Sequence, residues 1–267
     1  MRIAFIGGGN MGEAIIRGIL DRGLAEARDI VASDVSEKRR SYLSQEHGVV
    51  TDSDNRHAVE GVECIVLAVK PASLPEVMKG LKGFLQPDQL VLSIVAGASV
   101  ASLRDGLGHR AIVRAMPNMP AQIGEGVSVW TATSKVRKEH SKIASSILGA
   151  LGKEIFVSDE KYIDMATAVS GSGPAYVLLI IESLIDAAVH IGLPRELAQE
   201  LVLETVLGAT HLSQKSAKHP AELRNLVTSP GGTTAEGLLQ LEDGGLRGLL
   251  AQAIIAGYEK AKVLRGQ

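Results

Sequence analysis

A glycine-rich loop directly after the first apolar segment constrains the fold more than any other feature of this chain. Ile3–Ile6 is a short apolar run, which is typical of a strand buried on both faces. Gly7, Gly9 and Gly12 follow with the spacing G-x-G-x-x-G. In this pattern the first glycine permits a tight turn, the second lets a pyrophosphate approach the backbone, and the third allows close packing of a helix on the strand. We therefore expect a strand, a turn and a helix whose N-terminus binds phosphate.

The residues beyond the loop favour a dinucleotide site over an ordinary glycine-rich turn. Ala14–Leu20 carries apolar residues at helical spacing, and Asp29–Ser33 is a second strand-like run that ends at Asp34. Asp34 lies about 20 residues beyond Gly12, which is the separation at which such folds place a carboxylate that binds a ribose hydroxyl. The loop alone is a weak signal, and this βαβ context is what favours the dinucleotide.

Composition narrows the classes of partner. The chain has 267 residues, of which 45% are hydrophobic, so we expect a globular protein with two domains. A net charge of −2 and only 3% aromatic residues argue against a nucleic-acid partner. We see no uninterrupted apolar run of about 18 residues and no signal-like start, so we expect no membrane segment and a cytoplasmic location. The one cysteine, Cys64, is expected to be a small buried hydrophobe.

Strand-like and helix-like segments alternate through residues 1–158, and this alternation predicts a doubly wound parallel sheet. The further strands are expected at Glu63–Val69, Leu90–Val95, Ala111–Met116, Val127–Trp130 and Glu154–Val157, and the further helices at Ser36–Glu46, Leu74–Leu81 and Lys135–Leu151. In such sheets ligands lie beyond the carboxyl ends of the strands. The segments Ala68–Pro71, Ala96–Ala98 and Pro117–Pro120 follow three of these strands, either as ligand contacts or as simple connecting turns.

Two signals conflict over the choice of cofactor. Asp34 can accept hydrogen bonds from a ribose 2′-hydroxyl and would repel a 2′-phosphate, which favours NADH. Lys38 or Arg39 could instead bind that phosphate and favour NADPH, although both also suit a solvated helix face. We favour NADH, with NADPH as a second usable cofactor.

Residues 159–267 show helical patterns only, so we expect a mainly helical second domain. The stretch Pro174–Ile191 is apolar on almost every side, which indicates burial either in its own core or against a second subunit. A helical domain of this size would bury such a helix most readily against another copy of the chain. We therefore expect a homodimer or a larger homo-oligomer.

Two motifs in this half are not explained by helix packing. Ser170–Tyr176 and Val227–Thr234 each place glycines and hydroxyl side chains ahead of an expected helix. Free N–H groups at a helix start bind carboxylates, which suggests a carboxylate-bearing substrate. Ser172 and Thr233 could instead be simple N-caps that need no ligand.

Five motifs in this order resemble those of the pyrroline-5-carboxylate reductase family along the whole chain. They are G-G-G-N-M-G at 7–12, A-V-K-P at 68–71, M-P-N-M-P at 116–120, S-G-S-G-P-A-Y at 170–176 and V-T-S-P-G-G-T-T at 227–234. The resemblance implies a Rossmann domain followed by an all-helical dimerisation domain, a homo-oligomer, and NAD(P)H-dependent reduction of 1-pyrroline-5-carboxylate to L-proline, the last step of proline biosynthesis.

The resemblance also implies roles for particular residues, and it implies no metal site. The cofactor would contact Gly7, Gly8, Gly9, Asn10, Met11, Gly12, Asp34, Asn55, Ala68, Val69, Lys70, Pro71, Ala96, Gly97 and Asn118. The substrate would contact Glu160, Ser170, Gly171, Ser172, Gly173, Val227, Gly231, Gly232, Thr233 and Thr234. Met119 departs from the family pattern, where threonine is usual.

The inventory of acids and bases favours an imine as substrate. Reduction of a ketone creates an alkoxide that needs a proton donor, commonly Lys or His, and residues 163–189 contain neither. An imine can be protonated before reduction, so positioning suffices, and the Thr234 hydroxyl is the expected contact to the ring nitrogen. The alternatives are a 3-hydroxy acid dehydrogenase, with Lys161 as its nearest catalytic lysine, and a dinucleotide-binding regulator without turnover.

Overall fold

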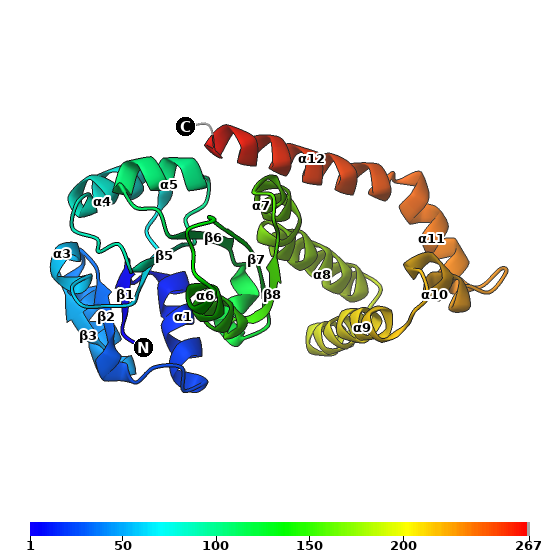
Figure 1. The fold of residues 1–267 in the computed structure, drawn as a ribbon. Helices are drawn as coiled ribbons and strands as arrows, with labels where there is room; N and C mark the ends of the chain where they lie inside the picture. The colour runs from blue at the N-terminus through cyan, green and yellow to red at the C-terminus, as the bar shows by residue number, and fades with distance from the viewer. Residues whose placement is uncertain (266–267) are drawn as a thin grey trace. The chain divides into compact units, whose positions relative to one another are not determined.

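A computed structural model describes residues 1–265, and the chain divides into two compact units (Figure 1). Among the described residues, the first unit contains 1–172 and 257–265, and the second contains 173–256. Residues 159–172 and 257–265 therefore belong to the same compact unit as the sheet. The expected domains, 1–158 and 159–267, have other bounds than these compact units, and this domain division stays a prediction.

Eight strands of the described chain form one sheet in the order β3-β2-β1-β4-β5-β6-β7-β8. They are β1 (Ile3–Ile6), β2 (Ile30–Ser33), β3 (Val50–Asp52), β4 (Cys64–Leu67), β5 (Leu90–Ser93), β6 (Ile112–Met116), β7 (Gly126–Ala132) and β8 (Gly152–Phe156). Strand β7 pairs antiparallel with β6, and the other pairs are parallel. The predicted doubly wound sheet is confirmed. Strand β3 and the antiparallel direction of β7 were not predicted.

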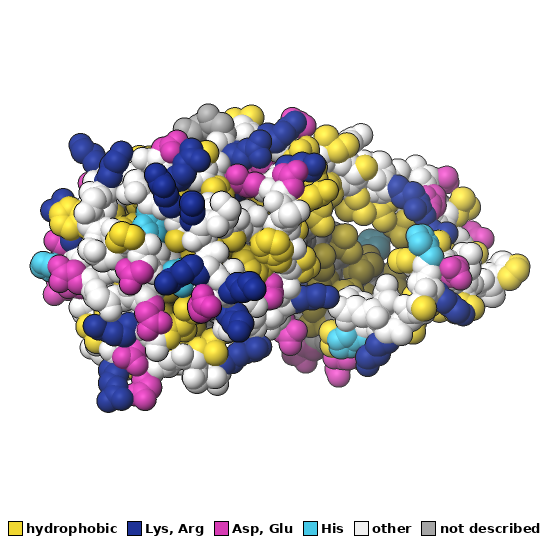
Figure 2. Space-filling view, in the orientation of Figure 1, with side chains coloured by type: hydrophobic (Ala, Val, Ile, Leu, Met, Phe, Trp, Pro, Cys, Tyr) yellow, Lys and Arg dark blue, Asp and Glu magenta, His cyan; other side chains and the backbone are white. Residues whose placement is uncertain are grey.

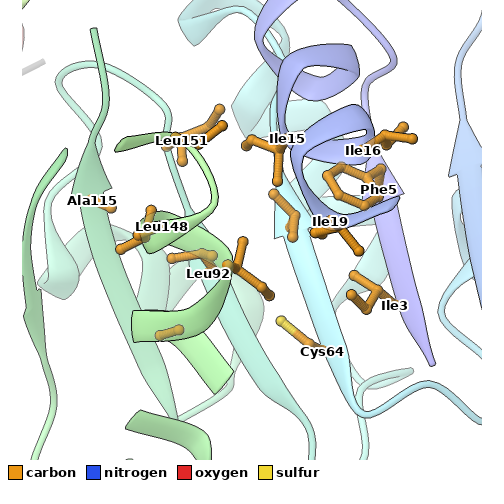
Figure 3. Close-up of a cluster of buried hydrophobic side chains, with 14 of the residues drawn as sticks. Ile3, Phe5, Ile15, Ile16, Ile19, Cys64, Leu92, Ala115, Leu148 and Leu151 are labelled. Atoms are coloured by element: carbon orange, nitrogen blue, oxygen red, sulfur yellow. The ribbon is translucent and has the colours of Figure 1, made fainter. Parts of the chain in front are cut away.

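Helices cover both faces of the sheet. They are α1 (Asn10–Asp21), α2 (Glu37–His47), α3 (Asn55–Ala58), α4 (Leu74–Leu81), α5 (Val100–Leu107) and α6 (Lys138–Gly149). Because successive strand residues point to opposite faces, Ile3 and Phe5 pack with α1, α2 and α6, whereas Ala4 and Ile6 pack with α3, α4 and α5. Figure 3 shows Ile15 and Ile19 of α1 beside the strands of this first layer. Burial on both faces explains why the strands read as continuous apolar runs.

Cys64 begins β4 and is fully buried, as expected from its apolar run. Burial raises the pKa of its thiol to about 12, so the thiolate that reacts with disulfides and metals is not formed near neutral pH. Cys64 therefore acts as a core residue.

A buried ion network joins β6 to the segment that follows the sheet. Arg114 on β6 is 2% exposed and donates to Glu160 Oε1 at 2.6 Å and to Asp164 Oδ1 at 2.8 Å. Arg265 donates to the other oxygen of Asp164 at 2.7 Å, and the backbone N–H of Val100 donates to Glu160 Oε1 at 2.8 Å. Four segments distant in sequence are thereby held together, including α7 (Lys161–Ala166) and the end of α12 (Leu246–Arg265).

The second unit contains α8 (Gly173–His190), α9 (Arg195–Lys215), α10 (Pro220–Leu226), α11 (Thr233–Asp243) and the first part of α12. Helices α8 and α9 pack against each other. No residue of α8, α10 or α11 is fully buried, and only Ala198 is buried on α9. The unit has almost no core of its own, which agrees with the expectation that α8 requires a partner surface.

Large apolar side chains lie exposed on these helices (Figure 2). Leu179 on α8 is 62% exposed, and Leu249 on α12 is 60% exposed. Among the described residues, the continuous helix Lys161–His190 is the one long and apolar enough to cross a membrane, although α8 contains charged residues and no uninterrupted run. Length and composition alone are weak evidence for a membrane span, because a helix at a subunit interface has the same character.

We predict that Arg114→Met lowers the free energy of unfolding by about 3 kcal/mol, because it leaves the buried Asp164 carboxylate without one of its two cations. Denaturant unfolding measures this change. Arg104→Met is the matched control, since Arg104 pairs with Asp105 on the exposed surface and its loss should change stability little. Equal effects of the two substitutions would contradict a structural role for the buried network.

Candidate functional site

Two glycines of the loop are required by packing inside the protein. Gly7 has φ of +99°, and a Cβ atom there would lie 2.8 Å from the carbonyl oxygen of Ala68. A Cβ atom on Gly12 would lie 2.6 Å from the carbonyl oxygen of Gly7. Both contacts are too short for any side chain, so the loop packs directly on the end of β4 and on the start of α1. The sequence pattern predicted a tight turn at Gly7 and close packing of the helix on the strand at Gly12.

Gly9 is different, because nothing lies within 4 Å of the position of its Cβ atom. It is the N-cap of α1, and no side chain accepts a hydrogen bond from the first turn of this helix. The N–H groups of Asn10, Met11 and Gly12 therefore lack helical acceptors. This exposed helix start, with open space at Gly9, fits the pyrophosphate of a dinucleotide.

Asp34 lies beside the loop at the end of β2. Its carboxylate accepts from the N–H of Gly8 at 2.9 Å and from the N–H of Ser36 at 2.9 Å. Each oxygen keeps a second lone pair, so the carboxylate can still bind a ribose hydroxyl. Asn55 is held to the residue before Asp34, because its amide oxygen accepts from the Ser33 hydroxyl at 2.7 Å. Within residues 1–265 the amide nitrogen of Asn55 has no hydrogen-bond partner, which suits the predicted ribose contact.

The turns after β4 and β5 reach the same edge of the sheet. The N–H of Ala68 continues the ladder to Ile6 at 2.9 Å, Val69 contacts Gly7, and Lys70 is exposed before the turn that begins at Pro71. Gly97 has φ of +77°, and its Cβ position lies 2.9 Å from the carbonyl oxygen of Leu264. Gly97 is thus packed by the end of α12, so this glycine is explained without a ligand.

Both polar atoms of the Asn118 side chain form hydrogen bonds within the protein. Its amide nitrogen donates to the carbonyl oxygen of Ser170 at 3.1 Å, and its amide oxygen accepts from the N–H of Val127 at 2.9 Å. It therefore ties the loop after β6 to the S-G-S-G segment, and its cofactor contact stays a prediction. The neighbouring Met119 is 51% exposed.

The S-G-S-G segment does not begin a helix, so the expectation of free N–H groups or an N-cap at Ser172 was wrong. Thr167–Gly171 is a π-helical turn that runs on into α8, and the N–H of Ser172 donates to Thr167 at 2.9 Å. The Ser170 hydroxyl donates back to Ala166 at 2.9 Å. Glycine and serine tolerate this irregular turn. Such turns are frequent at functional sites.

The second motif does form a helix start, but Gly232 and not Thr233 is the N-cap of α11. Thr233 and Thr234 are the first helical residues, and no side chain caps them. Gly231 has φ of +66°, and a Cβ atom on Gly232 would overlap the Ser229 hydroxyl. The glycines thus build a tight turn that leaves the N–H groups of this helix start available to an anion, as a carboxylate site requires. Val227 beside it is 65% exposed.

The ion network also occupies Glu160, a predicted substrate contact. Its Oε1 atom already accepts from Arg114 and from the N–H of Val100. Arg114 itself was missed in the sequence, although a single arginine in an otherwise apolar strand signals a buried carboxylate partner. Glu13 was also missed. The available signal was a charged residue directly after the glycine loop.

We predict that Gly9→Ala raises the Kd for NADH at least about tenfold while the melting temperature stays unchanged. The reason is that the added Cβ atom meets no protein atom and instead occupies the space where a pyrophosphate would approach. Calorimetric titration and thermal melting measure the two properties. Gly80→Ala is the matched control, since its Cβ position is equally open but lies on α4. Unchanged NADH affinity in Gly9→Ala would rule out the phosphate assignment.

Two family models match different parts of the chain. A family model described as NADP oxidoreductase, coenzyme F420-dependent, matches residues 2–97. A second model, described as pyrroline-5-carboxylate reductase dimerisation, matches residues 160–264. The first covers the glycine loop and the first strands, and the second covers the exposed helices.

Individual relatives match along nearly the whole chain. A Pseudomonas aeruginosa protein named pyrroline-5-carboxylate reductase is 40% identical over 267 residues, covering 100% of this chain and 97% of that protein. A solved pyrroline-5-carboxylate reductase from Coxiella burnetii has a TM-score of 0.89 at 38% identity and covers 98% of both chains. The Plasmodium falciparum pyrroline carboxylate reductase, solved with NADP bound, has a TM-score of 0.91 at 33% identity and covers 99% of this chain and 98% of that one. Identity at this level over the full length shows that the chain belongs to the pyrroline-5-carboxylate reductase family.

Proposed function

We propose that this protein reduces 1-pyrroline-5-carboxylate to L-proline with NADH or NADPH, as the last step of proline biosynthesis. The observation that carries the proposal is the pair of uncapped helix starts that the glycine motifs build at Gly9 and Gly232. One suits the pyrophosphate of a dinucleotide and the other suits the carboxylate of a small substrate. Family membership supplies the reaction that uses both.

The residues of the sheet edge are assigned to the cofactor. The N–H groups at the start of α1 would hold the pyrophosphate, and Asp34 with Asn55 would hold the ribose. The turns at Ala68–Pro71 and Ala96–Gly97 would border the remaining part. When bound there, a reduced nicotinamide supplies the hydride.

The residues of α11 are assigned to the substrate. The N–H groups of Thr233 and Thr234 would bind the carboxylate, and Val227 would pack on the ring. The Thr234 hydroxyl would contact the ring nitrogen and keep the imine oriented. Hydride addition to the carbon of an imine protonated on nitrogen breaks the C=N π bond and leaves its electron pair on that nitrogen, so the product is a neutral amine. No anion needs stabilising, which is why positioning is sufficient.

The environment of Lys161 argues against the alternative function, a 3-hydroxy acid dehydrogenase that would use this lysine as its catalytic residue. The Lys161 ammonium lies 2.9 Å from Asp159 on the exposed surface. The hydrogen bond that Lys161 donates to the Asp159 carboxylate raises the pKa of Lys161, which makes it a poorer proton donor near neutral pH. A catalytic lysine would need the opposite shift.

The helical unit is assigned to self-association. The match to a dimerisation model supports a homo-oligomer, and we propose that the apolar surfaces of α8 and α9 form the contact in a dimer or larger assembly. Residues such as Leu179 would be buried there instead of in a membrane. A cytoplasmic location is part of the same proposal.

The reaction is tested by mixing the protein with NADH and pyrroline-5-carboxylate and following the absorbance of the reduced nicotinamide, then repeating the assay with NADPH. Consumption that depends on the imine, with L-proline as product, is expected. Consumption with a hydroxy-acid couple and none with the imine would favour the dehydrogenase alternative. Binding of the dinucleotide without turnover of any substrate would favour the regulator.

We predict that Thr234→Ala lowers kcat/KM for pyrroline-5-carboxylate at least about tenfold, equivalent to roughly 1.4 kcal/mol of lost transition-state stabilisation. The loss should follow from a misplaced imine, so the affinity for NADH should not change. Thr234→Ser keeps the hydroxyl and is expected to retain most of the activity. Steady-state kinetics equal to wild type in the alanine variant would remove Thr234 from the mechanism.

A further inference from the structure

Glu13, in the first turn of α1, collects three polar groups from α2. Its Oε1 atom accepts from the Tyr42 hydroxyl at 3.0 Å and lies 3.2 Å from His47 Nε2. Its Oε2 atom accepts from the guanidinium of Arg39. The side chains of Glu13 and Arg39 are only 20% and 23% exposed, so this ion pair is largely shielded from water.

The charge on Glu13 is maintained by these contacts. Partial burial opposes ionisation, but the hydrogen bonds from Arg39, His47 and Tyr42 outweigh it and lower the pKa of the Glu13 carboxyl. At neutral pH the group is therefore a carboxylate, and its bond to Arg39 is charge-assisted. Such bonds are about twice as strong as those between neutral groups.

Arg39 is also tied to the glycine loop. Its Nε atom donates to the carbonyl oxygen of Gly8, while the N–H of the same glycine donates to Asp34. The Tyr42 ring lies under the guanidinium, with 4.9 Å between Arg39 Cζ and the ring centroid. Asp34 and Arg39 thus hold the two sides of one residue in the loop. The orientation of the guanidinium is set by Gly8, Glu13 and the Tyr42 ring together.

We propose that Glu13 is a specificity-determining residue that sets the balance between NADH and NADPH. It engages Arg39, the cation on α2 that binds the Gly8 carbonyl of the glycine loop, and thereby keeps that cation from a ribose 2′-phosphate. A 2′-phosphate beside Asp34 would meet the carboxylates of Asp34 and Glu13, and it would recruit Arg39 only by breaking the bond to Glu13. Arg40, which donates to the carbonyl oxygen of Asp34 at 2.7 Å, and the exposed Lys38 remain as further cations, which leaves NADPH usable. The proposal rests on the proposed function in that it takes a nicotinamide dinucleotide as the cofactor.

The test is Glu13→Gln, which keeps the shape of the side chain and removes its charge. We expect the ratio of kcat/KM for NADPH to that for NADH to rise about tenfold. The change should arise from a lower KM for NADPH, with kcat unchanged, because Arg39 acts on cofactor binding. A merely structural role would alter both cofactors equally. An unchanged ratio, or a shift toward NADH, would overturn the proposal.

Two controls separate the contact from a general charge effect. Glu46→Gln removes the same charge from an exposed position on α2 and should leave the ratio unchanged. In the double variant Glu13→Gln with Arg39→Gln the gain should disappear, because the cation that is released is no longer present. A gain that persists without Arg39, or that Glu46→Gln reproduces, would refute the role of the Glu13–Arg39 pair.

Binding measurements keep this proposal independent of the reaction. Calorimetric titration of wild type and Glu13→Gln with NAD⁺ and NADP⁺ should show the same shift in the ratio of Kd values without any imine present. If wild type binds both dinucleotides but does not reduce pyrroline-5-carboxylate, the proposed function fails. The ratio of the Kd values for NAD⁺ and NADP⁺ in the two proteins then still tests whether Glu13 sets cofactor specificity. If Glu13→Gln does not fold, Glu13→Asp withdraws the carboxylate from Arg39, and a shift in the same direction is then required.

Discussion

The contact between the glycine loop and the end of β4 determines how the rest of the first unit can be used. Gly7 and Gly12 allow the backbone of the loop to approach Ala68 and the start of α1 more closely than any side chain would permit. This close approach places the first turn of α1 at the carboxyl edge of the sheet. The parallel strands β2, β4 and β5 also end at this edge. A helix start with unpaired N–H groups and open space at Gly9 is the consequence. The proposed cofactor contacts all follow from that position.

The second unit, in contrast, buries very few of its own side chains. Its helices expose leucines and isoleucines that a protein of this size ordinarily places in a core. Association of copies can remove this surface from water, and the match to a dimerisation model agrees with that explanation. The hydrophobic effect would then stabilise the assembly in the way that core packing stabilises the sheet unit. The same unit contains the Gly231–Thr234 turn, so in this proposal the substrate contacts lie on helices that self-association would stabilise.

Side chains that were expected to contact ligands also hold the protein together. Glu160 is engaged by Arg114 and by the start of α5, and both ends of the Asn118 amide bind other segments. Arg39 is likewise committed to Gly8 and Glu13. Buried or partly buried polar groups require partners, and around this site those partners are other residues of the chain. We therefore propose that the choice between NADH and NADPH depends on two things: that Arg39 is present, and how strongly Gly8 and Glu13 hold it.

The sequence by itself determined the features that are local in the chain. The apolar runs predicted β1, β2, β4, β5 and β6, and the glycine spacing predicted the turn at Gly7 to Gly12, because burial and backbone freedom are properties of consecutive residues. Strand β3 was missed because it has three residues at the edge of the sheet, with little burial to mark it. Only the tertiary structure decided that Ser170–Gly173 continues a helix, that Gly232 caps α11, and that Glu13 holds Arg39. These outcomes depend on hydrogen bonds between residues far apart in the chain or on the exact path of the backbone, and neither is specified by the spacing of residue types.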